Sequence, residues 1–222
     1  MFVIRFALLS SFFYALNVSM LPLIYTFEIS AFLFLFIRFG TTFFTSLIVT
    51  KSLFSFSEVK RQKLGIWILI LSILFGVQSW LYVEAVKYMS VGLASVVLFT
   101  YPLITYLIVS LLKRRSLDLI TILMFIVATL GIAAISQSSE GYYTMVIGIV
   151  LALLSALTYS LILILTPRVS ELKNWEIVKY TTLIPALTFL YLFINETGFY
   201  WPPSEGLILS LISGTFFATG MM

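Results

Sequence analysis

The chain has 222 residues, of which 61% are hydrophobic and only 10% are charged. Soluble globular proteins carry about 25% charged residues, so this chain cannot cover a water-facing surface. It has no histidine and no cysteine, which excludes Ser-His-Asp and thiol catalysis, disulfides, iron–sulfur clusters and imidazole metal sites. The net charge of +4 is interpreted as a topology signal and not as a nucleic-acid footprint, because the basic residues fall in short loops.

Long apolar stretches follow one another along almost the whole chain. A membrane-spanning helix needs about 20 mainly apolar residues, and these stretches lack the alternation of barrel strands. The pattern therefore predicts an all-α fold, a polytopic membrane helix bundle. The predicted spans, in chain order, are Ile4–Tyr25, Ser30–Thr50, Leu64–Val83, Ser90–Leu112, Leu117–Ser136, Met145–Thr166, Ile177–Ile194 and Gly206–Met222.

The basic residues indicate how these spans are oriented. If the N-terminus is cytoplasmic, the cytoplasmic segments hold 11 of the 13 basic residues, the exterior loops hold only Lys87, and Arg38 lies inside a span. The positive-inside rule then predicts a multi-pass protein of the plasma membrane with a cytoplasmic N-terminus. The cytoplasmic set is Arg5, Lys51, Lys60, Arg61, Lys63, Lys113, Arg114, Arg115, Arg168, Lys173 and Lys179.

An internal repeat relates the two halves of the chain. Residues 7–22, ALLSSFFYALNVSMLP, match residues 152–167, ALLSALTYSLILILTP, at seven of sixteen positions. A second echo relates LILSILFG at 69–76 to LILSLISG at 207–214. The first span thus corresponds to the sixth and the third to the eighth. The repeat unit is five helices, and an odd number inverts the second half relative to the first.

The repeat predicts two domains. Residues 1–138 form a first five-helix repeat, and residues 139–222 form a second repeat that lacks its last two helices, so that eight of ten helices are present. Charges support the inversion, because equivalent loops of the two halves have exchanged their basic residues. The alternative left open is a native eight-helix protein.

Short motifs resemble those of a known family. The segment Ala85–Ser95, AVKYMSVGLAS, is followed by Tyr101 and Pro102, and the first span contains Tyr-Ala-Leu-Asn at 14–17. Together with Arg38 in the second span, these resemble the drug/metabolite transporter superfamily, EamA-like branch. The resemblance implies ten helices in two inverted repeats and transport of small metabolites, often outward. One departure is Lys113-Arg114, which stands where the family commonly has Gly-Glu.

Polar residues inside the spans are the candidate substrate-binding residues, because such groups are costly in lipid. Arg38 is a candidate for an anion or carboxylate contact. The alternatives are a structural ion pair, with Glu84 as a possible partner, and snorkelling of the side chain to the outer interface. Glu84 either couples protons at an outer gate or is interfacial. The full predicted set is Tyr14, Asn17, Arg38, Gln78, Trp80, Glu84, Ser95, Thr100, Tyr101, Pro102 and Tyr159.

Two further features of this set have alternatives that stay open. Pro102 removes a backbone donor near the middle of the fourth span and predicts an interruption, either a substrate position or a packing kink. Asn17 and Gln78 either line a cavity or bridge helices. Ser95 lies in a cluster of small residues with Gly92 and Ala94 that also predicts close helix packing.

The expected function is transport of small metabolites by alternating access. The resemblance implies amino acids or similar polar solutes, moved outward. A non-transporting membrane scaffold, or a degenerate truncated transporter, is the alternative. No enzymatic activity, no cofactor, no metal and no nucleic-acid partner is expected. The expected partners are a small-molecule substrate and the lipid bilayer, and a homodimer is left open.

Overall fold

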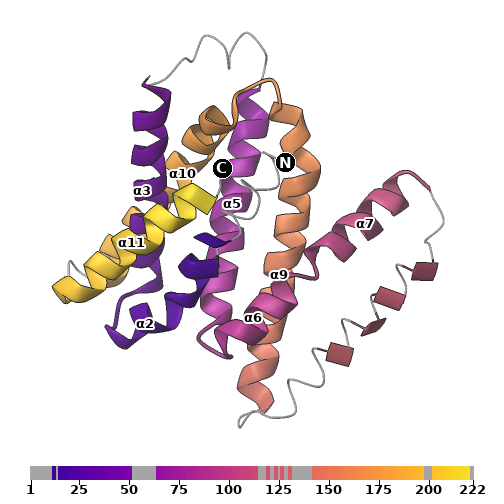
Figure 1. The fold of residues 1–222 in the computed structure, drawn as a ribbon, viewed down its shortest axis with the longest axis horizontal. Helices are drawn as coiled ribbons and strands as arrows, with labels where there is room; N and C mark the ends of the chain where they lie inside the picture. Colours follow the sequence, from indigo (N-terminus) through magenta and orange to yellow (C-terminus); the bar gives the residue numbers. More distant parts are fainter. Residues whose placement is uncertain are drawn as a thin grey trace. The chain divides into compact units, whose positions relative to one another are not determined.

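The computed structural model describes residues 12–13, 15–51, 64–114, 142–197 and 202–220, with short stretches between 119 and 131. Helices make up nearly all of this described part, and no strand lies within it (Figure 1). The chain divides into two compact units, unit 1 (Met1–Gly76 and Arg168–Met222) and unit 2 (Val77–Pro167). The elements are α2 (Leu21–Thr26), α3 (Ala31–Thr50), α5 (Gly65–Ala85), α6 (Val91–Leu98), α7 (Tyr101–Leu112), α9 (Tyr142–Leu165), the 3₁₀ turn η1 (Thr166–Val169), α10 (Asn174–Thr197) and α11 (Ser204–Gly220).

The predicted spans are largely confirmed. Five described stretches are long and apolar enough to cross a membrane, and two shorter apolar helices lie at Ala15–Thr26 and Ser204–Thr219. The predicted span Leu117–Ser136 and the first residues of Ile4–Tyr25 lie largely outside the described residues. The five membrane-length stretches are Ala31–Thr50, Gly65–Ala85, Val91–Leu112, Met145–Val169 and Asn174–Glu196.

Local sequence determines where two of these helices begin. Ser30 caps α3, because its hydroxyl accepts a hydrogen bond from the Phe32 amide at 3.3 Å. Ser90 caps α6 in the same way, accepting from the Leu93 amide at 3.3 Å. A serine oxygen at this position satisfies one of the helix's unpaired N–H groups. At the other end of α3, Lys51 adopts a left-handed conformation with φ of 50°, which ends the helix.

In unit 1, α3 and α10 run antiparallel along a shared seam. The Ser30 hydroxyl, just before α3, donates to the Glu196 carboxylate near the end of α10 at 2.9 Å. Further along, the Phe39 and Phe189 rings stack with centroids 5.9 Å apart. Phe217 of α11 meets Phe39 edge to face at 6.1 Å. These three buried rings form an apolar core where α3, α10 and α11 meet.

Two parallel helix pairs complete unit 1. Helix α11 crosses α3 obliquely (Figure 1), and the two run in the same general direction, because Gly206 packs against Ile29 and Gly214 against Thr41. The first half of α5, residues 65–76, follows α10, because Ser72 donates to the Tyr180 carbonyl at 3.4 Å. Gly76 then approaches α10 at Pro185.

One cation–aromatic contact joins the start of α5 to the start of the α9–α10 connection in unit 1. The Arg168 guanidinium lies over the Trp67 ring, 4.3 Å from its centroid. An amphipathic ring beside a cation is typical of the headgroup layer of a bilayer.

Unit 2 is organised around α9, against which α6, α7 and the second half of α5 pack. Its core cluster consists of Ala85, Leu93, Val97, Met145 and Ala152. At Gly148 a Cβ would come within 3.1 Å of side-chain atoms of Tyr88 and Met89, so a larger residue would require these neighbours to shift by a few tenths of an ångström. The prediction that Gly92 belongs to a close-packing face is wrong, because Gly92 is exposed and has no atom within 4 Å of a built Cβ.

Candidate functional site

In unit 1, Asn17 bridges two helices through its side-chain amide. Its Nδ2 donates to the Ser213 carbonyl at 2.6 Å and to the Ser213 hydroxyl at 2.7 Å. Asn17 is fully buried, and its Oδ1 is a buried acceptor with no hydrogen-bond partner among the described residues. Such an oxygen can accept a hydrogen bond from a solute. The structure thus shows the helix-bridging alternative and leaves an acceptor beside the bridge.

Arg38 lies inside the same unit, on α3. It is 4% exposed, and its guanidinium carbon lies 3.6 Å from the centroid of the Phe217 ring. Helix α11 can approach α3 closely here because residue 214 is glycine. A Cβ atom placed on residue 214 would lie only 3.3 Å from the Arg38 Cα. Ser213 and Phe217 are four residues apart on one face of α11. Asn17 and Arg38 therefore both contact that face.

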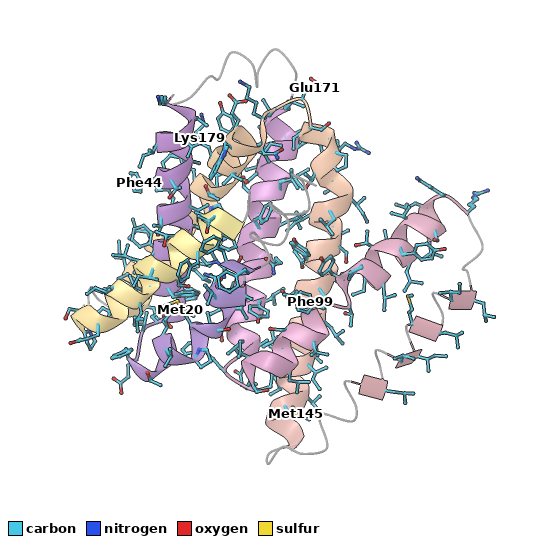
Figure 2. The ribbon with its side chains drawn as sticks, in the orientation of Figure 1. Met20, Phe44, Phe99, Met145, Glu171 and Lys179 are labelled. Atoms are coloured by element: carbon cyan, nitrogen blue, oxygen red, sulfur yellow. The ribbon has the colours of Figure 1, made fainter. Side chains whose placement is uncertain are left out.

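Sequence reasoning counted Lys179 among the cytoplasmic basic residues, and the structure adds that its side chain is buried inside unit 1. Lys179 is the sixth residue of α10 and is fully buried (Figure 2). Its Nζ lies 5.2 Å from the centroid of the Tyr180 ring. A basic side chain at this depth belongs to the candidate functional residues. The available signal was its position inside the predicted span Ile177–Ile194.

In unit 2, Gln78 and Ser155 form a reciprocal pair. The Gln78 Nε2 donates to the Ser155 hydroxyl at 3.2 Å, and that hydroxyl donates to the Gln78 carbonyl at 3.0 Å. The Ser79 hydroxyl donates to the Gln78 Oε1 at 3.3 Å. Gln78 thus bridges α5 and α9. In the sequence, Ser155 stands out only because it matches Ser10 in the internal repeat, and no pattern pairs it with Gln78.

The predicted interruption of the fourth span is present. Helix α6 ends at Leu98 and α7 begins at Tyr101, with Phe99 and Thr100 in a turn between them (Figure 2). Pro102 lies within the first two positions of α7, where its missing N–H costs nothing. The Thr100 hydroxyl donates to the Val97 carbonyl at 2.8 Å.

Two tyrosines meet beside this interruption. The rings of Tyr101 on α7 and Tyr159 on α9 lie edge to face with centroids 4.6 Å apart. The Ser160 hydroxyl donates to the Tyr101 carbonyl at 2.9 Å and so ties α9 to the first turn of α7. Both tyrosines are partly exposed, so their hydroxyls and ring edges can contact a solute.

The remaining predicted residues lie apart from these contacts. Glu84 pairs with Lys87 at 2.7 Å, one turn along the chain, and its side chain is 17% exposed. The Ser95 hydroxyl lies 2.9 Å from the Tyr82 hydroxyl. Trp80 is 36% exposed on the surface of α5. Tyr14 lies outside the described residues.

The structure therefore brings the predicted residues together in two clusters, one in each unit. Unit 1 holds Asn17 and Arg38, which both contact α11, together with Ser213, the partner of Asn17. Lys179 is a further buried basic residue of that unit. Unit 2 holds Gln78, Tyr101 and Tyr159 with the adjacent interruption. Within the described part of the chain, no three acidic side chains are grouped so as to hold a metal ion.

Comparison with known proteins supports one family. None of the curated proteins compared with the chain matches it. One solved structure, titled only as the crystal structure of a protein, superposes with a TM-score of 0.65 at 18% identity, covering 98% of this chain and 78% of the other. That likeness shows a shared fold alone. The profile of the EamA-like transporter family matches residues 1–137, more than half of the chain. With its apolar spans, the chain is a multi-pass membrane protein, and it belongs to the EamA-like transporter family.

Proposed function

We propose that this chain exports small polar metabolites, amino acids or similar solutes, by alternating access. In this proposal the chain spans the plasma membrane and its N-terminus lies in the cytoplasm. The match to the EamA-like transporter family carries the proposal, because membership makes the chain a membrane transporter of small solutes. Beyond family membership, the proposal specifies the class of solute, the direction of transport and the membrane. No covalent step is needed for this activity.

Buried polar groups inside apolar helices support a polar solute. Asn17, Arg38, Gln78 and Lys179 are all less than one-tenth exposed, although each lies in an apolar helix. Such groups are expensive in a bilayer and mark solute pathways or helix contacts. Amide, hydroxyl and basic groups together fit the ammonium and carboxylate of an amino acid.

The interrupted fourth span supports a solute position near the membrane midplane. The turn at Phe99–Thr100 divides the span Val91–Leu112 nearly in half. Transporters commonly hold substrate at such breaks, where backbone groups leave the regular helix. Tyr101 and Tyr159 lie beside the break and are the residues of unit 2 proposed to contact the solute.

Contacts within unit 1 support the inverted repeat of residues 1–138 and 139–222, on which alternating access depends. Gly76 and Gly214 end the two eight-residue echoes. Gly76 packs on α10 at Pro185, and Gly214 packs on α3 at Thr41.

The helix directions agree with that repeat. Both glycine contacts lie in parallel helix pairs, whereas α3 and α10 are antiparallel. A twofold rotation that exchanges α3 with α10 would also exchange the first half of α5 with α11. It would therefore place the Gly76–α10 contact on the Gly214–α3 contact. Ser72 and Ser210, at equivalent positions of the echoes, are both fully buried and donate to the carbonyls of Ile68 and Gly206, four residues earlier.

Solute exchange in proteoliposomes tests the proposal. Liposomes with the purified chain are loaded with a mixture of the common amino acids, and labelled amino acids are added outside one at a time. We expect saturable accumulation of at least one of them, inhibited by an excess of the same unlabelled solute. Exchange equal to that of protein-free liposomes for every solute would favour the non-transporting scaffold.

A matched pair of variants shows whether exchange depends on the buried cluster. Arg38→Met removes a buried cation in unit 1, whereas Lys87→Met removes an exposed cation that pairs with Glu84. We expect exchange to fall at least tenfold in Arg38→Met and to stay within twofold in Lys87→Met. Inside-out and right-side-out cell membrane vesicles then establish the direction.

A further inference from the structure

One end of unit 1 is formed by the last turn of α3 and the first turns of α5 and α10 (Figure 1). Ser30, just before α3, bonds to Glu196 near the end of α10, and the two helices are of similar length, so Lys51 at the end of α3 lies level with the first turn of α10. The parallel pair agrees, because Ser72 of α5 and Tyr180 of α10 are in contact and lie seven or eight residues into their helices. The three segments therefore meet at one level.

Three exposed basic side chains lie on these segments and on the connection into α10, and we call them the basic end of unit 1: Lys51, Arg168 and Lys173. Two acidic residues share that connection. The Glu176 carboxylate accepts a hydrogen bond from the Lys173 amide at 3.3 Å and so takes part in starting the helix. Glu171 is exposed. The described basic side chains therefore outnumber the described acidic ones at this end.

The opposite end of unit 1 is acidic. Glu28 precedes α3, Glu196 lies near the end of α10, and Glu205 lies in the first turn of α11. All three side chains are exposed. Gly206 packs against Ile29, which brings the start of α11 to the start of α3. The charges of unit 1 thus differ between its two ends, and the basic end is the one that attracts an anion.

Arg168 and Trp67 keep hydrogen-bond donors available at the basic end. The Arg168 guanidinium carbon lies 4.3 Å from the centroid of the Trp67 ring. Among the described residues, neither the guanidinium N–H groups nor the indole N–H has a hydrogen-bond acceptor. Arg168 is exposed and Trp67 is half-buried, so an anion can reach the cation from outside the helices. The pair therefore offers a charged group and an aromatic N–H side by side.

The position of this pair along the spans indicates which anion it meets. Arg168 is one residue from the end of the membrane-length stretch Met145–Val169, and Trp67 is the third residue of the stretch Gly65–Ala85. Residues at the ends of such stretches lie at the headgroup layer of a bilayer. Lipid phosphates are the anions concentrated in that layer. Two phosphate oxygens match the paired N–H groups of arginine, and an indole N–H can donate to a headgroup oxygen.

We propose that the basic end binds an anionic phospholipid, whose phosphate Arg168 holds beside Trp67. Lys51 and Lys173 add positive charge at the same end, and this charge favours a headgroup of net negative charge over a zwitterionic one that carries the same phosphate. With a cytoplasmic N-terminus the site faces the inner leaflet, where anionic lipids are concentrated. Lipid binding at this end does not require solute transport, because it uses only the surface of unit 1.

Lipid quenching of a single tryptophan tests the proposal. The chain has four tryptophans, so Trp80→Phe, Trp175→Phe and Trp201→Phe leave Trp67 as the only indole. The full chain with these substitutions is placed in phosphatidylcholine vesicles. Phosphatidylglycerol or phosphatidylcholine with brominated acyl chains is then added in increasing proportion, and the fluorescence of residue 67 is followed. We expect brominated phosphatidylglycerol to occupy the site at least threefold more strongly than brominated phosphatidylcholine.

Substitutions at residue 168 show whether the preference depends on this site. In the single-tryptophan chain, Arg168→Gln should make the two lipids bind equally. Arg168→Lys should keep part of the preference, because an ammonium retains the charge without the paired N–H groups. Lys113→Gln is the matched control, because Lys113 is an exposed basic residue at the end of α7 in unit 2, and it should keep the full preference. The unfolding midpoint of each variant establishes that it is folded.

Each outcome decides for or against the lipid site. Equal quenching by the two lipids in the single-tryptophan chain would overturn it. Equal loss of preference in Arg168→Gln and Lys113→Gln would also overturn it, because net charge would then attract the lipid without a site. Should Arg168→Gln fail to fold, an undiminished preference in Arg168→Lys would have the same meaning. Millimolar sn-glycerol 3-phosphate is expected to leave the preference unchanged, and a loss of preference in its presence would assign Arg168 to a soluble phosphate and reject the lipid.

Discussion

The side-chain amide of Asn17 donates to both the carbonyl and the hydroxyl of Ser213, at 2.6 and 2.7 Å, across 196 positions of sequence. The contact ties the first span to α11. Its neighbours in unit 1 include Arg38, which lies on Phe217 one turn further along α11.

Asn17→Ala should destabilise the protein. The substitution removes both bonds to Ser213 from a fully buried position, at a cost of about 1–2 kcal/mol. Thermal unfolding in detergent measures the loss. Asn195→Ala is the matched control, because Asn195 is exposed and its side-chain amide donates to the Tyr191 carbonyl of its own helix at 2.7 Å. Equal unfolding midpoints for the two variants would contradict the bridge.

Gly214→Ala should be destabilising although alanine favours helices. A Cβ at this position would lie 2.5 Å from the Thr41 hydroxyl oxygen and 3.3 Å from the Arg38 Cα, which forces α11 away from α3 at a cost of about 1–3 kcal/mol. Gly92→Ala is the matched control, because nothing lies within 4 Å of a Cβ there. It should stabilise by up to about 1 kcal/mol. The two changes in unfolding midpoint should have opposite signs.

A double-mutant cycle should detect coupling between Gln78 and Ser155. Gln78→Leu and Ser155→Ala each break the same reciprocal pair, so the double variant should lose about 1 kcal/mol less than the sum of the singles. The comparison cycle uses Gln78→Leu with Ser160→Ala, because Ser160 bonds to Tyr101 instead. That second cycle should be additive. Coupling in both, or in neither, would show that the pair is not specific.

Pro102→Ala should lengthen the fourth span. Restoring a backbone N–H at residue 102 allows the regular helical hydrogen bond to the Leu98 carbonyl. Spin labels attached after Gly92→Cys and Leu112→Cys would be about 30 Å apart along a straight helix. We expect a shorter distance with Pro102 present and an increase toward that value without it, while Leu103→Ala leaves the distance unchanged. An unchanged distance in Pro102→Ala would mean that packing on α9 maintains the turn.

Thiol labelling should establish the orientation. With a cytoplasmic N-terminus, Tyr88→Cys lies on the outer side and Glu171→Cys on the inner side, and both positions are exposed. An impermeant maleimide added to intact cells should label residue 88 at once and residue 171 only after permeabilisation. The opposite order would reverse the proposed topology.

The sequence predicted the spans well because length and apolar content are local properties. The predicted Ser30–Thr50 and Leu64–Val83 differ from α3 and α5 by at most two residues at either end. The turn beside Pro102 was predicted for the same reason, since a missing N–H acts on its own helix.

The partners of the candidate residues could not be predicted. Ser213 and Ser155 are bound by amides from helices far away in sequence, and such pairing depends on which helix faces meet. Lys179 shows the same difficulty. A basic residue near the end of an apolar stretch normally reaches water, and only the packing of neighbouring helices against α10 reveals its complete burial.

The contact between Arg168 and Trp67 affects how deeply unit 1 sits in the bilayer. The Trp67 ring favours the headgroup layer, and the Arg168 guanidinium is attracted to lipid phosphates. Because the two groups are in contact, the start of α5 and the connection into α10 are held at the same depth in the bilayer. If the bilayer thins or thickens, these two segments should rise and sink as one, and indole fluorescence at residue 67 would report their common depth.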